Sequence, residues 1–317
     1  MRIPVKEIFT RLHRNLISTL AIASLCILLP VSPRVGHARS LPETFYPPAL
    51  LAPQADLLPV SALNAPLDKS RSPDFPPSPC GESRGRVLEE RLESYWLGSI
   101  FSYRIYLPPC YSPTLQPGYP VLYLIHGMGS TDDQWDRMGI DEAADRLIAS
   151  GQIDPLIIVM PFDNSYAQPT QDPFDEALTG ELIPWIDRHY NSRPERAFRA
   201  VGGLSRGASW ALHLGLVSPE IFGAVGAHSL PIFWEDASQV IPWLENIPPE
   251  ALPRLYLDIG RGDTEVSAVM QFEASLAKSS IPHEFHLNNG YHEEAYWAAH
   301  LDQYLRWYSQ GWEDRTQ

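Results

Sequence analysis

A glycine-flanked serine at the end of a short apolar run constrains this chain of 317 residues more than any other feature. The run 198–202 leads directly into the sequence Gly-Leu-Ser-Arg-Gly at 203–207, and a stretch of helical composition follows at 208–214. A strand that turns at once into a helix strains the serine backbone and leaves no room for neighbouring Cβ atoms, which accounts for both glycines. The pattern predicts a nucleophile elbow, with the Ser205 hydroxyl exposed above the end of a sheet.

Two later segments supply an acid and a base, in the chain order Ser, Asp, His that is typical of such sheets. The predicted strand 254–260 is followed by a loop that holds Asp263, our candidate acid. Asp258 is the alternative, although its place inside the strand pattern favours a structural hydrogen bond. His292 follows a turn at 288–290, in a loop from which an imidazole can reach the serine. The histidines that we place inside helices or strands, and therefore set aside, are His189, His213, His283, His286 and His300.

The apolar strand 121–125 ends in a His-Gly turn that predicts half of an oxyanion hole. Two converging backbone N–H groups stabilise the negative charge of a tetrahedral intermediate without reorganisation. Met128 in the turn and Arg206 at the start of the helix after the elbow are the candidate donors. An ordinary tight loop is the alternative explanation of the turn.

These motifs resemble those of the esterase D-like, or feruloyl-esterase-like, branch of the α/β-hydrolases, which also contains S-formylglutathione hydrolases and mycolyltransferases. The resemblance covers about residues 85–312 and includes the segments 103–109, 157–161 and 181–187. One departure is Ala208, where the family often has a second glycine. The resemblance implies an α/β-hydrolase fold, with a mostly parallel central sheet and helices on both faces, and a triad that needs no cofactor.

The apolar pattern between the motifs is typical of a doubly wound α/β domain. It predicts a helix at 140–148, a buried strand at 155–161, a helical segment at 174–190, a short strand at 222–227 and a last helix that includes 297–308.

The first 79 residues predict a leader and a linker. Basic residues precede the apolar run 16–31, and small residues at 36–38 offer a cleavage site, so that 1–38 is predicted to be an export signal peptide. An uncleaved membrane anchor is the alternative. Residues 39–79 are Pro-rich without periodicity, which predicts a disordered linker and leaves 80–317 as one catalytic domain.

Cys80 and Cys110 are the only cysteines outside the leader. An oxidising destination, an even count and positions that flank the first two predicted strands favour a disulfide between them. Two buried free thiols are the alternative.

The charge of the chain excludes several kinds of partner. Removal of 1–38 takes away five basic residues and one acidic residue, so that the net charge falls from −14 to −18. Such acidity disfavours nucleic acid and anionic surfaces. The nearest approach to a metal-ligand cluster, at Asp132, Asp133 and Asp136, is better explained as a solvated loop and helix start. We expect no metal, no cofactor, no nucleic acid and no obligate protein partner.

The substrate pocket is expected in the connection 228–253, since loops at the carboxyl ends of strands carry specificity in such sheets. Its apolar residues suit an aromatic or medium acyl group, and Glu235, Asp236 and Glu245 could hold a polar alcohol such as a sugar. A merely amphipathic covering segment is the alternative. The predicted substrate contacts are Trp135, Asp163, Tyr166 and Trp234.

The leading function is therefore an exported serine esterase acting on a small-molecule or glycoconjugate ester. An acyltransferase that passes the same acyl group to a sugar or glycerol is the first alternative. A non-catalytic module that binds carbohydrate or the cell envelope is the second.

Overall fold

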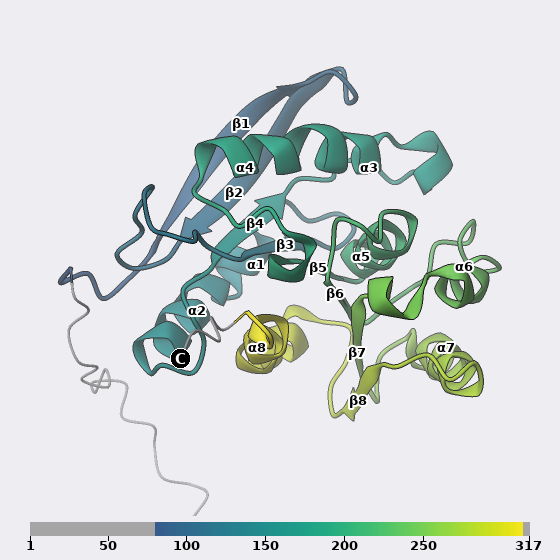
Figure 1. Ribbon diagram of the computed structural model, residues 1–317. Helices are drawn as coiled ribbons and strands as arrows, with labels where there is room; N and C mark the ends of the chain where they lie inside the picture. Colours follow the sequence, from purple (N-terminus) through teal and green to yellow (C-terminus); the bar gives the residue numbers. More distant parts are fainter. Residues whose placement is uncertain (1–79, 313–317) are drawn as a thin grey trace, which may run out of the picture. The chain divides into compact units, whose positions relative to one another are not determined.

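The computed structural model describes residues 80–312 of the protein. The predicted signal peptide and linker lie outside these described residues. An eight-stranded sheet crosses the domain in the order β1-β2-β4-β3-β5-β6-β7-β8, and all neighbours from β4 to β8 are parallel (Figure 1). β2 pairs antiparallel with both β1 and β4. The strands are β1 (Arg86–Ser94), β2 (Ser99–Leu107), β3 (Val121–Ile125), β4 (Ile157–Pro161), β5 (Arg199–Leu204), β6 (Ala224–His228), β7 (Arg254–Gly260) and β8 (Glu284–Asn288).

The central strands are near-continuous apolar runs because both faces of the sheet are covered. Every residue of β3, β4, β5 and β6 is buried. Since parallel strands end at the same edge, the loops after β3, β5, β7 and β8 meet there. The α/β-hydrolase fold that the sequence predicted, with a mostly parallel sheet and helices on both faces, is confirmed by this arrangement.

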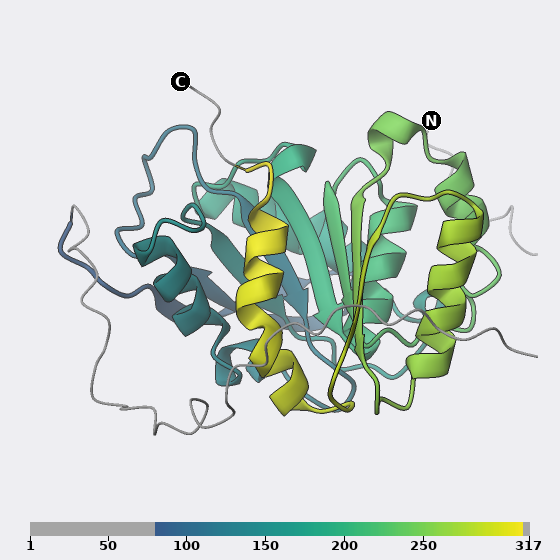
Figure 2. The same ribbon diagram turned by 90° about the horizontal axis from the view of Figure 1, so that it is seen from below.

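Helices cover both faces of the sheet, as two separate apolar clusters show. Buried residues of α2 and α8 pack on one face, whereas those of α3 to α7 pack on the other. Figure 2 shows α8 lying across its face of the sheet. The helices are α1 (Gln134–Arg137), α2 (Ile140–Ala149), α3 (Phe174–Ala177), α4 (Ile183–His189), α5 (Arg206–Val217), α6 (Val240–Asn246), α7 (Val266–Lys278) and α8 (Glu294–Ser309), with short 3₁₀ turns η2 (Pro169–Gln171), η4 (Arg196–Phe198) and η5 (Pro249–Ala251).

The predicted helical segment 174–190 differs in one respect from a single regular helix. A π-helical turn, η3 (Leu178–Leu182), joins α3 to α4. Pro184 has no N–H to donate to the ladder, and the hydrogen-bond pattern widens directly before it. Within residues 80–312, no helix has both the length and the apolar character needed to cross a bilayer.

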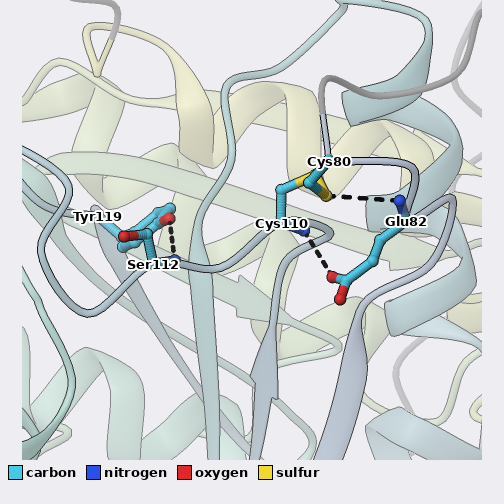
Figure 3. Close-up of a disulfide and its surroundings, with 5 residues drawn as sticks. All are labelled: Cys80, Glu82, Cys110, Ser112 and Tyr119. Atoms are coloured by element: carbon cyan, nitrogen blue, oxygen red, sulfur yellow. Dashed lines mark hydrogen bonds between the residues drawn. A yellow bond between two sulfur atoms is a disulfide. The ribbon is translucent and has the colours of Figure 1, made fainter.

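A disulfide joins Cys80 to Cys110, with their Cα atoms 5.7 Å apart, as predicted (Figure 3). Glu82 lies beside it, and its carboxylate accepts the backbone N–H of Cys110 at 2.9 Å. The bridge connects the start of the described chain to the segment that follows β2, so that it closes the first two strands into one covalent loop.

Candidate active site

Ser205 occupies a strained turn between β5 and α5. Its φ of 51° and ψ of −125° lie where residues with a side chain are rare. A Cβ at Gly203 would lie 2.2 Å from the carbonyl oxygen of Gly207, and a Cβ at Gly207 would lie 2.1 Å from that of Ile125. Both glycines are therefore required by close backbone contacts, which is the physical reason for the sequence pattern. The Ser205 N–H donates to the carbonyl of His228 at 2.9 Å.

The structure brings Ser205, His292 and Asp263 together at the carboxyl edge of the sheet. His292 Nε2 lies 2.9 Å from Ser205 Oγ, and His292 Nδ1 lies 3.0 Å from both carboxylate oxygens of Asp263. With Nδ1 donating to the carboxylate, Nε2 is left to accept the serine proton. The Asp263 side chain is fully buried and also accepts the N–H of Glu265, whereas 29% of the His292 side chain is exposed. The candidate base is thus held by a buried carboxylate and remains partly exposed to solvent.

Asp258, the alternative acid, lies in a different cluster. Its side chain is fully buried, and Oδ1 lies 2.6 Å from His228 Nδ1. Oδ2 accepts the hydroxyls of Tyr296 and Tyr304 at 2.6 and 2.7 Å. These contacts occupy both oxygens, so the structural role expected for a strand residue fits the geometry.

The predicted oxyanion donors flank the serine. The turn that carries Met128 adjoins the elbow, because a Cβ at Gly127 would lie 3.5 Å from Ser205 Cβ. Arg206 is the first residue of α5, where the first N–H groups have no partner within the helix. Its side chain is buried instead against Asp163 and Asp172, at 2.8 and 3.2 Å. Arg206 therefore offers its backbone N–H, not its guanidinium, to the site.

Residues 94–308 match the model of a protein family described as "Putative esterase". The chain belongs to this esterase family. The chain is 31% identical over 194 residues to an endo-1,4-beta-xylanase/feruloyl esterase of Xylanibacter ruminicola, a match that covers 58% of the chain and 25% of that relative. It is 30% identical over 193 residues to Esterase Rv1288 of Mycobacterium tuberculosis, covering 57% of the chain and 39% of that relative. The matched region thus spans less than half the length of either curated relative.

Solved structures with the same fold include a ferulic acid esterase, with a TM-score of 0.65, 25% identity, and coverage of 72% of this chain and 98% of that one. Another is the S-formylglutathione hydrolase FrmB from Staphylococcus aureus, with a TM-score of 0.58, 16% identity, and coverage of 71% and 99%. The resemblance predicted from the sequence motifs is confirmed at the level of family and fold.

The structure corrects two of the four predicted substrate contacts. The Trp135 side chain is buried, and its Nε1 donates to the carbonyl of Ile125 at 3.1 Å, so that it supports the end of β3. Asp163 is also buried, and its Oδ2 accepts from both Arg206 Nε and Trp210 Nε1. Neither side chain is free to contact a substrate.

The other two predicted contacts lie on the surface, and one neighbour was missed. Tyr166 is 67% exposed in the loop after β4, and Trp234 is 70% exposed in the loop after β6. Tyr291, 64% exposed, directly precedes His292. Its position next to the candidate base was the signal in the sequence.

The connection after β6 mainly covers the core, which was the alternative interpretation. Phe233, Val240 and Leu244 are buried in one of the two apolar clusters. Glu235 accepts hydrogen bonds from Thr170, and Asp236 lies 2.8 Å from His213 Nδ1. Both carboxylates already have hydrogen-bond partners within the protein, so the structure gives no support for their predicted role in holding a polar alcohol. The third, Glu245, accepts the hydroxyl of Ser279.

Proposed function

We propose that the protein is an exported serine esterase that uses Ser205, His292 and Asp263 to cleave carboxylic esters of polar alcohols. The observation that carries the proposal is the unbroken chain of hydrogen bonds from Ser205 Oγ through His292 to Asp263, beside backbone N–H groups at a helix start. The disulfide supports export, because such bonds persist in oxidising compartments.

The proposed reaction has two steps. Ser205 Oγ attacks the acyl carbon while its proton passes to His292 Nε2, and Asp263 stabilises the resulting imidazolium. The N–H groups of Met128 and Arg206 stabilise the oxyanion until the alcohol leaves with the proton from His292. Water then attacks the acyl-enzyme by the same route, releases the acid and restores the serine.

Exposed aromatic side chains support an aromatic acyl group. Tyr166, Trp234 and Tyr291 lie on loops that follow strands of the sheet, as does the exposed Met128 side chain. Aromatic rings gain energy by stacking or edge contacts with such side chains. The fold neighbours include a ferulic acid esterase in complex with ferulic acid. We therefore favour a feruloyl-type ester of a carbohydrate over a triglyceride.

A panel of acetyl, butyryl, octanoyl, palmitoyl and feruloyl esters, each with and without a sugar acceptor, tests the substrate class. Feruloyl and short acyl esters should be hydrolysed fastest, with Ser205→Ala as the inactive control. A preference for long-chain triglyceride would contradict the proposed substrate. Acyl-sugar formed faster than free acid would assign an acyltransferase.

Labelling with a fluorophosphonate probe tests the nucleophile itself. Mass spectrometry should find the phosphonyl group on Ser205 in the wild type and on no residue of Ser205→Ala. An unlabelled wild type would favour the non-catalytic binding module.

A further inference from the structure

The turn after β3 is held on both sides by side chains. The carbonyl oxygen of Gly127 lies 2.8 Å from His126 Nδ1 and also accepts the N–H of Ser130 at 3.1 Å. The N–H of Gly127 donates to Gln134 Oε1 at 2.8 Å. Because all of these partners belong to the protein, the peptide groups of the turn are oriented before any substrate arrives.

The neighbours of His126 determine which ring nitrogen carries the proton. The backbone N–H of Asp163 lies 3.0 Å from His126 Nε2, and an N–H can only donate. Nε2 is therefore the acceptor, and Nδ1–H donates to the Gly127 carbonyl. Burial lowers the pKa of His126, and this effect outweighs the hydrogen bond to Gly127, which raises it. The neutral ring thus has one tautomer that satisfies both contacts.

This hydrogen bond sets the direction of a candidate oxyanion donor. In a planar trans peptide the C=O and the following N–H point in opposite directions. Holding the Gly127 carbonyl toward His126 therefore turns the Met128 N–H to the other side of the peptide. We propose that His126 is a positioning residue that aims the Met128 N–H at the oxyanion of the tetrahedral intermediate.

Asp163 contacts both His126 and Arg206, the residue that carries the second candidate oxyanion donor. Its backbone N–H binds His126, while its carboxylate binds Arg206 Nε at 2.8 Å. All three residues are at least 90% buried. One short loop after β4 thus contacts His126, beside the turn of the first candidate donor, and Arg206, which carries the second. The role that we assign to His126 rests on the proposed esterase function.

Two isosteric substitutions separate positioning from simple structural support. His126→Asn keeps a side-chain N–H at the position of Nδ1 and loses the acceptor at Nε2. His126→Gln keeps an acceptor near Nε2 and loses the donor to Gly127. The control is His189→Gln, because His189 Nδ1 makes the same kind of bond, 2.8 Å from the carbonyl of Trp185, on the exposed end of α4.

We expect His126→Gln to lower kcat about 100-fold with little change in KM, and His126→Asn to stay within about fivefold of the wild type. Binding of a trifluoromethyl ketone, which forms an oxyanion adduct with Ser205, should weaken in parallel with kcat. His189→Gln should match the wild type. Thermal unfolding of each variant identifies losses that come from misfolding.

Three results would overturn the assignment. They are a His126→Gln enzyme within threefold of the wild type, equal losses in the Asn and Gln variants, and unchanged ketone affinity in a variant with lowered kcat. A wild type that neither hydrolyses esters nor reacts with a fluorophosphonate overturns the proposed function instead, so the two failures are distinguishable.

Discussion

The protein contains two hydrogen-bonded chains of hydroxyl, histidine and aspartate that share the same order of contacts but differ in their surroundings. In each, the hydroxyl lies about 3 Å from Nε2 of the histidine, and Nδ1 faces the carboxylate. The first chain is Ser205–His292–Asp263, and the second is Tyr308–His228–Asp258.

The two chains differ in their access to solvent. The His292 side chain is 29% exposed, whereas His228 and Asp258 are fully buried. In the buried chain, the Tyr308 hydroxyl is wedged against the sheet, since a Cβ at Gly202 or Gly226 would lie within 2 Å of it. Burial and the charge of Asp258 raise the pKa of Tyr308 well above its ordinary value. A hydroxyl in this position can hold a fold together but cannot meet a substrate.

The two chains also differ in what surrounds the hydroxyl group. Ser205 stands at a strained elbow beside the start of α5 and the turn of Gly127, so that a developing oxyanion has donors nearby. The buried chain supports this elbow, because the carbonyl of His228 accepts the Ser205 N–H. An active site therefore needs more than a hydroxyl, a histidine and a carboxylate in line. The substrate must be able to reach the hydroxyl, and preorganised N–H donors must be ready to bind the oxyanion.

Removal of Ser205 or His292 should have the largest effect on activity. Ser205→Ala and His292→Ala should each lower kcat on an activated ester about 10⁴-fold or more, because members of a triad act as a unit. Urea unfolding should remain close to that of the wild type, since neither side chain is part of the core. Either variant keeping more than about a tenth of the activity would exclude the proposed triad.

The two aspartates should then differ in what they control. Asp263→Asn should lower kcat about 10³- to 10⁴-fold, because an amide favours the wrong tautomer of the base. Asp258→Asn, measured per folded molecule, should keep kcat within about tenfold, because its contacts are with His228 and two tyrosines. Stopped-flow or steady-state assays on active-site-titrated enzyme measure both. The opposite order would transfer the role of the acid to Asp258.

The groups that the structure brings together as the sequence predicted are those that follow the ends of strands. Ser205, Asp263 and His292 each follow a strand, and parallel strands end at one edge, so chain order was enough to predict that they meet. The two cysteines were found from their number and the predicted export. In each case the backbone path determines the position, and the backbone path is visible in the apolar pattern.

The errors concern which way a side chain points. Trp135 lies close to the site along the chain, but its indole packs into the core. Asp163 follows β4 at the expected edge, yet its carboxylate is bound by the guanidinium of Arg206. His126 was noted only as part of a turn, because nothing in the sequence indicates which partners a ring nitrogen finds. Such orientations depend on contacts between residues far apart in the chain.

Stability should respond to the aspartates in the reverse order. Asp258→Asn should lower the free energy of unfolding by about 3–5 kcal/mol, because it breaks a fully buried pair. Asp263→Asn should cost about 1 kcal/mol, since the amide can still accept the N–H of Glu265. Urea titrations with both variants provide the measurement. Equal losses would mean that the accessible chain contributes as much to the fold as the buried one.

A third histidine sharpens the comparison, because two carboxylates raise its pKa. His213 on α5 lies 2.8 Å from Asp236 and 3.9 Å from Asp175. Burial lowers the pKa of His213, but hydrogen bonds and charges from the two carboxylates outweigh burial and raise the pKa from 6.5 to about 9. The contacts of His213 with these two carboxylates should therefore stabilise the connection after β6 through charge.

The raised pKa of His213 makes the protein less stable as the pH rises. With a folded-state pKa above the unfolded value, the stabilisation is complete below about pH 6.5 and is lost as the pH rises through about 9. We expect the free energy of unfolding to fall by about 3 kcal/mol over this window, and His213→Gln to remove most of that dependence. Urea unfolding of both proteins near the two ends of the window measures it. If the wild type and His213→Gln showed the same pH dependence across the window, the folded state would not raise the pKa of His213.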